Sequence, residues 1–286
     1  MTARIRLDRP SFLGRGFISL RTTPCSWNQC IFCGFSQGCV EMVPTIEQLI
    51  EQIRYGLDRF HNVRDSWWIL NKGSFFDDRQ IPEKHRLAIA DYLSSQNIER
   101  LFIESRPEFL FESSLTSFLE RLRKTGKLTV GLGLEVSNQN ILSLIRKGLD
   151  LKVFERCVKL LRSKDVNVQT FLMAGLPGAR EPETSLESIR YAKRVGSNEI
   201  MISATVPRRG TSLRAMWERR EWKPIDITRF YEIVDSARTV FEPENVDVWA
   251  LDLHVYQSDA QKEAYEHYKL ASKRHQLHID DFAVNS

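Results

Sequence analysis

The chain has 286 residues, and its 41 Lys and Arg residues against 37 Asp and Glu residues leave a formal net charge of +4. Hydrophobic residues make up 42% of the chain, which is ordinary for a globular protein and excludes disordered, collagen-like and low-complexity classes. The small positive excess permits an acidic partner such as a nucleic acid but does not require one. Because no stretch approaches the roughly 18 apolar residues of a membrane helix, we expect a cytoplasmic protein without a membrane segment.

Short apolar runs alternate with amphipathic stretches after an N-terminal arm over residues 1–15. The apolar runs predict six strands, at residues 16–21, 66–70, 101–104, 129–134, 166–173 and 199–204. Helices are predicted at residues 45–62, 83–95, 115–124, 139–147, 152–164 and 184–194. The first and last of these helices open with capping boxes, Thr45-x-x-Gln48 and Thr184-x-x-Glu187.

This order of elements predicts an α/β fold. Six β/α units over residues 16–215 indicate a partial (β/α)6 TIM-like barrel, whose functional site would lie at the carboxyl ends of the strands. Residues 216–286 predict a helix at 227–241, a strand at 247–253 and a helix at 260–276. We interpret this part as a short C-terminal α/β extension that closes the barrel, since no Pro-, Gly- or Ser-rich linker marks a second domain.

Three of the five cysteines crowd the loop after the first predicted strand, where Cys25, Cys30 and Cys33 form a C-x4-C-x2-C pattern. Three thiolates on one loop can hold three corners of a [4Fe–4S] cluster and leave one iron for a non-protein ligand. A structural zinc site would need a fourth ligand, for which Cys39 and the distant histidines are candidates. Either way, an odd number of cysteines in this pattern indicates metal ligands in a reducing compartment.

Further motifs follow the other predicted strands. They are Asn71-Lys72-Gly73-Ser74, Glu104-Ser105-Arg106-Pro107-Glu108, Gly133-Leu134-Glu135-Val136-Ser137, Arg146-Lys147-Gly148, Gly175-Leu176-Pro177-Gly178 and Pro207-Arg208-Arg209-Gly210-Thr211-Ser212-Leu213. With the cysteines, this set resembles the radical S-adenosylmethionine (AdoMet) superfamily over residues 16–213, and within it the archaeosine synthase and elongator-type radical subunits. The usual cluster spacing there is C-x3-C-x2-C, so this chain has one additional residue between Cys25 and Cys30.

The resemblance implies a [4Fe–4S] cluster on the three cysteines and AdoMet as the second cofactor, cleaved reductively to a 5′-deoxyadenosyl radical that abstracts hydrogen from a substrate. It implies cofactor contacts from Asn71, Gly73, Ser74, Glu104, Arg106, Glu135, Ser137, Arg146, Gly175 and Pro177. It also implies an electron donor such as flavodoxin or ferredoxin. Cys39, six residues past the cluster motif, is a candidate catalytic hydrogen donor, a ligand of a second metal or a packing residue.

The substrate stays open between a modified tRNA base and a small amino-acid- or nucleoside-like molecule, because the chain is barely basic and has no recognisable RNA-binding appendage. The reaction type, lyase or transferase, and the oligomeric state are open as well. As an alternative, Cys25, Cys30, Cys33 and Cys39 would hold zinc in a non-enzymatic α/β module that contacts RNA.

For several other residues the sequence allows both a functional and a structural role. A buried Glu135 needs a partner, which is a polar ligand or Arg106. Arg208 and Arg209 are expected either to bind a carboxylate or phosphate of the substrate or to lie in a solvated loop. Core or docking positions are expected for the remaining set: Trp67, Trp68, Phe75, Phe76, Cys157, Tyr265 and Tyr268.

Overall fold

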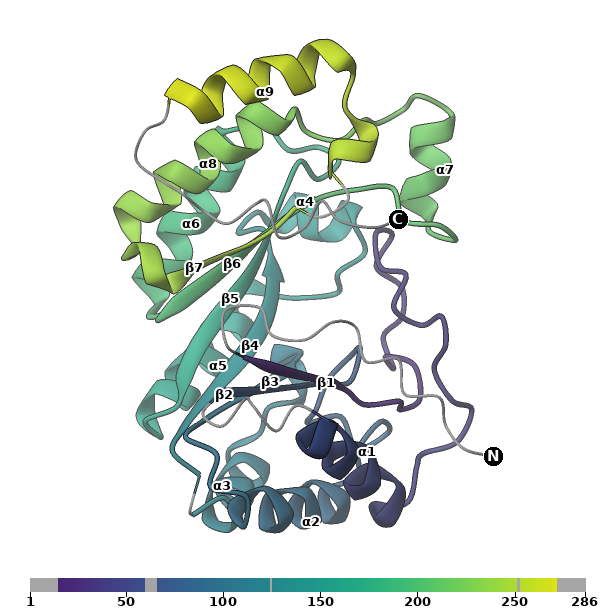
Figure 1. The fold of residues 1–286 in the computed structure, drawn as a ribbon, viewed down its shortest axis with the longest axis vertical. Helices are drawn as coiled ribbons and strands as arrows, with labels where there is room; N and C mark the ends of the chain where they lie inside the picture. Colours follow the sequence, from purple (N-terminus) through teal and green to yellow (C-terminus); the bar gives the residue numbers. More distant parts are fainter. Residues whose placement is uncertain (1–14, 60–65, 124, 251–252, 272–286) are drawn as a thin grey trace.

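The computed structural model describes residues 15–59, 66–123, 125–250 and 253–271. Within them, seven parallel strands form one sheet in chain order (Figure 1): β1 (Gly16–Ser19), β2 (Ser66–Leu70), β3 (Arg100–Ser105), β4 (Lys127–Glu135), β5 (Asn167–Ala174), β6 (Glu199–Ala204) and β7 (Val246–Trp249). The protein is therefore an α/β half-barrel with β1 and β7 at its edges. Because β7 pairs with β6, the segment after residue 215 lengthens the same sheet.

Nine helices of the described residues lie outside the sheet (Figure 1). They are α1 (Ile46–Arg59), α2 (Glu83–Ser94), α3 (Glu112–Arg121), α4 (Gln139–Leu144), α5 (Leu151–Ser163), α6 (Glu183–Val195), α7 (Ser212–Glu218), α8 (Ile227–Val240) and α9 (Asp259–Ala271). Helix α8 packs against α6, and α9 lies over α8. The N-terminal arm up to residue 14 and the predicted helix beyond residue 271 fall outside the described residues.

One of the two predicted capping boxes is present. The Thr45 N–H donates to Gln48 Oε1 at 2.9 Å, and the Gln48 N–H donates to Thr45 Oγ1 at 3.3 Å. The box at Thr184 was wrong, because α6 begins at Glu183 with Pro182 in the capping position. Thr184 therefore lies inside the first turn, where its hydroxyl accepts from the Arg180 N–H at 3.0 Å.

Alternate residues of the strands face the helices and the inside of the half-barrel. Ile18 packs on Gly56 of α1, so its neighbour Phe17 faces inward. There the Phe17 ring lies 5.1 Å from Trp68, which stacks on Phe102 at 3.8 Å. A Cβ atom at Gly131 of β4 would lie 2.4 Å from the Phe102 ring, so the absence of a side chain at Gly131 makes room for that ring.

Polar contacts join the two edge strands near their amino ends. The Arg15 guanidinium, just before β1, pairs with Asp247 of β7 at 3.1 Å. The Gln169 amide of β5 donates to the same carboxylate at 2.6 Å and to Glu199 at 3.2 Å. The amino ends of the half-barrel are thereby tied together, whereas the motifs identified in the sequence follow the carboxyl ends.

The predicted packing positions are confirmed. Trp67, Trp68, Phe75 and Phe76 are buried, and Cys157 is 4% exposed in the core. From α9, Tyr265 stacks on Tyr231 of α8, and the Tyr268 hydroxyl contacts Asp235. None of the helices in the described ranges has the length and apolar character needed to cross a bilayer.

Candidate active site

The cysteine loop runs from β1 to α1 over the carboxyl ends of the strands and is anchored by Ile31. This residue, between Cys30 and Cys33, is buried in a small apolar cluster with Val136, Ile141, Leu142, Ile145, Leu176 and Leu213. Its N–H donates to the Ile145 carbonyl at 3.1 Å, and its carbonyl accepts from the Leu213 N–H at 2.9 Å. The loop is thus held from both the α4 and the α7 side.

The thiols of this loop are partly buried and free of disulfides. Burial raises the pKa of Cys30, and the nearby Lys147 ammonium opposes the rise. Burial also raises the pKa of Cys33 to about 11, with the thiols of Cys30 and Cys25 acting in the same direction. Within the described ranges, no three His, Cys, Asp or Glu side chains are grouped to hold a single metal ion. Without a cation, the Cys30 and Cys33 sulfurs favour the protonated form, and metal binding releases those protons.

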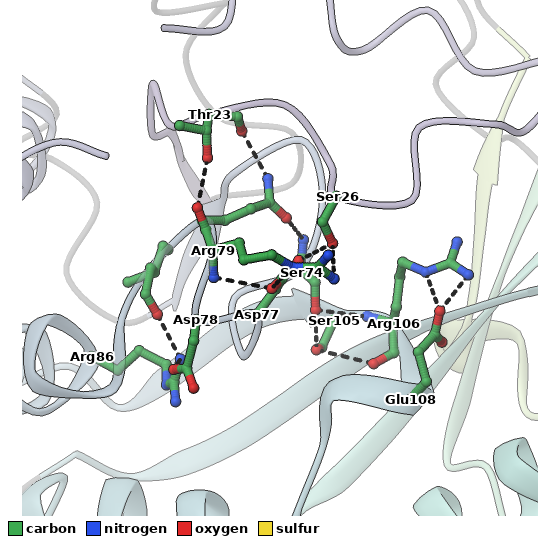
Figure 2. A network of polar contacts seen from close by, with 12 residues as sticks. Thr23, Ser26, Ser74, Asp77, Asp78, Arg79, Arg86, Ser105, Arg106 and Glu108 are labelled. Carbon is green, nitrogen blue, oxygen red and sulfur yellow. Dashed lines mark hydrogen bonds and ion pairs between the residues drawn. The ribbon is translucent and has the colours of Figure 1, made fainter. Parts of the chain in front are cut away.

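The longer spacer between Cys25 and Cys30 is attached at two points. Ser26 contacts the Asp77 carboxylate and accepts from Arg79 at 2.8 Å (Figure 2). Trp27 donates its indole N–H to the Arg146 carbonyl at 2.8 Å, and its ring is tight against Gly148. Ser26 thus attaches the spacer to the segment after β2, and Trp27 attaches it to the segment after α4.

The turn after β2 is built around the buried Gln80 side chain. Gln80 Oε1 accepts from the Ser74 N–H at 2.7 Å, while its amide nitrogen donates to the Thr23 carbonyl at 2.9 Å. A Cβ atom on Gly73 would lie 2.3 Å from Gln80 Oε1, so a larger residue there would displace the Gln80 amide from its hydrogen bonds. Gln80 thereby ties the turn to the start of the cysteine loop. The sequence analysis missed this residue, whose only signal was its proximity to the Gly73 turn.

The Glu104 carboxylate serves the same turn. Glu104 Oε1 accepts from the backbone N–H groups of Asn71 and Lys72, at 3.1 and 3.0 Å. Burial raises the pKa of Glu104, and these amide donors oppose the rise. Ser74, next in the turn, shares a 2.6 Å hydrogen bond with Ser105, and its hydroxyl oxygen accepts from the Arg106 N–H at 3.1 Å (Figure 2).

Asn71, at the carboxyl end of β2, has polar atoms without partners. It is 1% exposed, and neither its side-chain oxygen nor its side-chain nitrogen forms a hydrogen bond with a described residue. An unsatisfied buried amide costs free energy, so such a group indicates a missing partner. Asn71 is the described residue that most directly indicates a polar ligand at this end of the half-barrel.

Glu135 ends β4 in a strained conformation. Its φ is +68°, and the register with β5 shifts between Gly133 and Glu135. Its Oε1 lies 2.6 Å from the Lys147 Nζ, with both side chains buried. Of the two expected partners, Arg106 is therefore not the protein partner of Glu135. Lys147 takes that place because Arg146 has a φ of +52°, which ends α4 and leaves Arg146 exposed but Lys147 buried.

Arg106 instead braces the neighbouring loops. It pairs with Glu108, donates to the Lys147 carbonyl at 2.8 Å, and lies with its guanidinium 5.5 Å from the Trp27 ring centre. These contacts join β3, the end of α4 and the cysteine loop. Cys30 lies within reach of the same charges, since Lys147, Glu135 and Arg106 all influence its pKa.

The remaining expected site residues are held by backbone contacts. Gly175 has a φ of +82°, donates to Glu181 Oε1 at 2.8 Å and accepts from the Trp222 indole at 2.9 Å. Pro177 is buried beside it, and Ser137 is hydrogen-bonded to Ser188 of α6. The Cys39 thiol is partly buried and donates to the Phe35 carbonyl at 3.5 Å.

The family described as the radical SAM superfamily matches residues 20–183, more than half of the sequence. The chain belongs to the radical SAM superfamily. Membership implies a [4Fe–4S] cluster and AdoMet as the cofactors of this site.

Relatives among characterised and uncharacterised proteins agree with the resemblance to the archaeosine branch. An uncharacterized protein of Methanocaldococcus jannaschii, MJ0550, is 25% identical over 234 residues, covering 77% of this chain and 64% of the relative. Archaeosine synthase subunit beta of Methanosarcina acetivorans is 22% identical over 229 residues, covering 77% of this chain and 66% of the relative. The chain thus spans less than two thirds of the length of these two relatives.

Solved structures share the fold. The Elp3 protein of Methanocaldococcus infernus aligns with a TM-score of 0.62 at 18% identity, over 92% of this chain and 65% of that one. Methylornithine synthase aligns with a TM-score of 0.57 at 12% identity, over 82% of this chain and 70% of that one. At these identities the likeness concerns the half-barrel alone.

The residues present fit both cofactors. Three thiols on an anchored loop are the donor set of a cluster with an open iron. The unpartnered amide of Asn71 supplies a donor and an acceptor of the kind that an amino acid moiety satisfies.

Proposed function

We propose that this protein uses a [4Fe–4S] cluster to cleave AdoMet reductively, and that the resulting 5′-deoxyadenosyl radical abstracts hydrogen from a substrate that is a modified tRNA base or a small amino-acid- or nucleoside-like molecule. The observation that carries the proposal is the cysteine loop anchored at Ile31 over the carboxyl ends of a parallel half-barrel. The chemistry supplied by the bound cofactors needs one electron from a donor such as flavodoxin or ferredoxin, which we expect to meet the enzyme in the cytoplasm.

The residues of the protein bind the two cofactors and orient them. Cys25, Cys30 and Cys33 hold the cluster. Cofactor contacts are proposed for Asn71, Gly73, Ser74, Glu135, Ser137, Arg146, Gly175 and Pro177, with the turn at 71–74 meeting the methionine end and the turn at 175–177 meeting adenine. Glu104 acts on the turn through its two amide hydrogen bonds, and Arg106 acts through Trp27 and Lys147.

The interior beneath the cofactors favours a shielded reaction. The rings of Phe17, Trp68 and Phe102 form an apolar layer on the inner side of the half-barrel, and such a layer favours a reaction shielded from water. We further propose that residues 16–215 form the radical core and that residues 216–286 help to close it. Cys39 remains a candidate hydrogen donor to the substrate.

The test is anaerobic reconstitution with iron and sulfide, then reduction with dithionite in the presence of AdoMet and an assay for 5′-deoxyadenosine. We expect about four irons per chain, a coloured protein and cluster-dependent 5′-deoxyadenosine. Cys30→Ala should lose both iron and product. Cys157→Ala, which removes a buried thiol of α5 outside the loop, is the matched control and should keep both.

Two results would contradict the proposal. A colourless protein with one zinc ion and no 5′-deoxyadenosine would support the zinc-binding module instead, and loss of that zinc in Cys39→Ala would identify the fourth ligand. A brown protein that binds AdoMet but yields no 5′-deoxyadenosine with any reductant would support the cluster but contradict the proposed radical reaction.

A further inference from the structure

One segment beside the candidate active site carries a local excess of positive charge. Residues 208–223, which we call the basic segment, contain six cations and two acids: Arg208, Arg209, Arg214, Arg219, Arg220 and Lys223 against Glu218 and Glu221. Their excess of four charges equals the formal net charge of the whole chain. The rest of the sequence is therefore electrically balanced, and the low net charge conceals a strongly basic patch.

The basic segment lies at the mouth of the candidate active site. It comprises α7 and its flanks, and Figure 1 shows α7 beside the loop that leads from β1 to α1. The Leu213 N–H donates to the Ile31 carbonyl at 2.9 Å, and Gln37 donates to the Arg209 carbonyl at 3.0 Å. The positive charge is thus fixed against the cysteine loop.

Most of these cations lack an acidic partner. Arg214 pairs with Glu218, and Arg219 with Glu221, both at 2.7 Å. No acidic side chain in the described part of the chain pairs with the other four, Arg208, Arg209, Arg220 and Lys223. Arg209, Arg220 and Lys223 are also exposed. Such a group of unpaired cations repels itself, and a polyanion relieves that repulsion.

Aromatic rings accompany the cations. The Arg214 guanidinium lies 4.5 Å from the ring centre of the half-buried Trp217, and Tyr256 meets the same ring at 5.6 Å. Arg208 lies 5.4 Å from the ring centre of Phe35, which is 45% exposed. Cations beside accessible aromatic faces suit a strand that carries both phosphates and bases, whereas an acidic protein needs only the charge.

We propose that the basic segment binds the phosphate backbone of an RNA, so that a base carried on that RNA reaches the carboxyl ends of the strands. RNA binding follows from the charge and the rings alone. Only the delivery of a base to the radical site depends on the proposed function. Of the two substrate classes left open above, the segment favours the base in RNA.

The test measures binding of a fluorescein-labelled RNA hairpin with a single-stranded loop to the full chain, by fluorescence anisotropy over a range of KCl concentrations. The variant is Arg209→Gln/Arg220→Gln/Lys223→Gln. Its matched control is Lys152→Gln/Arg156→Gln/Lys159→Gln, which removes three exposed cations of α5, far from α7 in Figure 1. We expect tenfold or greater weakening for the first variant, and a slope of log K against log [KCl] smaller by about 2. The control should bind like the parent chain.

Three outcomes would overturn the inference: no binding of the hairpin, equal weakening in both triple variants, or unchanged RNA binding together with lost binding of flavodoxin. The assay for 5′-deoxyadenosine with dithionite is run both without and with the RNA, so it reports on the proposed function separately from RNA binding. A chain that binds RNA through the segment but makes no 5′-deoxyadenosine keeps this inference and loses the proposed function. A chain that makes 5′-deoxyadenosine but does not bind RNA through the segment keeps the proposed function and loses this inference.

Discussion

Lys147 and Glu135 form a buried ion pair, with 2.6 Å between Nζ and Oε1, at the point where β4 ends in a left-handed residue. Removing one partner would leave the other charge buried and unpaired. We expect Lys147→Met to lower the free energy of unfolding by about 3–5 kcal/mol. The measurement is urea denaturation of the apo-protein.

The double variant Glu135→Gln/Lys147→Met is the control for this pair. It carries no buried charge at the site, so it should recover most of the loss. A double variant as unstable as Lys147→Met would show that the loss of stability does not come from an unpaired Glu135 carboxylate.

Gly148 allows Trp27 to dock. Its φ is +64°, and a Cβ atom there would lie 2.1 Å from the indole ring. Gly38 offers a matched control, since its φ is +78° and nothing lies within 4 Å of the Cβ position. Both alanine variants carry the backbone strain of about 1–2 kcal/mol, but only Gly148→Ala also displaces the ring.

We therefore expect Gly148→Ala to cost at least about 1 kcal/mol more than Gly38→Ala, and to shift the tryptophan fluorescence of the apo-protein. The reconstituted Gly148→Ala variant should also hold less iron, because Trp27 fixes the spacer between Cys25 and Cys30. Equal effects of the two substitutions on stability and iron content would contradict this role of Trp27.

Gln80 connects the turn at residues 71–74 to the cysteine loop. Replacing it with leucine leaves the Ser74 N–H and the Thr23 carbonyl without their partner, at a cost of about 1–3 kcal/mol. We expect Gln80→Leu to lower both the stability and the AdoMet affinity measured by calorimetry. Gln96→Leu, at an exposed position just after α2, is the matched control and should leave both unchanged. Normal AdoMet binding by Gln80→Leu would show that the turn keeps its shape without the bridge.

Cys157 should make stability fall at alkaline pH. Burial raises the pKa of its thiol from 9.0 to about 12. Above pH 9 the unfolded chain loses this proton while the folded chain keeps it, so the free energy of unfolding decreases as pH rises. The thiol should account for a loss of about 1 kcal/mol between pH 8 and pH 10.

The pH dependence of Cys157→Ala isolates this contribution. The variant is less stable throughout because it leaves a cavity, but its free energy of unfolding should fall less steeply over the same interval. Parallel curves for the two proteins would show that the Cys157 proton is not held by the fold.

Local patterns in the sequence were sufficient for the sheet type, the position of the cysteine loop and most of the elements, but they did not predict α7. Apolar runs identify the strands, and amphipathic periodicity identifies the helices between them. The Thr45 box formed because its two partners are three residues apart in one turn. The equivalent box at Thr184 failed because Pro182 takes the capping position and the helix begins at Glu183, which places Thr184 inside the first turn.

Partners far apart along the chain were decided by the tertiary structure. Glu135 meets Lys147 and not Arg106, because a positive φ at Arg146 turns the end of α4 and buries the next side chain. The docking of Trp27 on Gly148 depends in the same way on loops more than a hundred residues apart. Residue types and spacing determine which groups are available at the carboxyl ends of the strands. Backbone dihedrals and side-chain directions decide which of them meet, and these depend on the packing of the whole half-barrel.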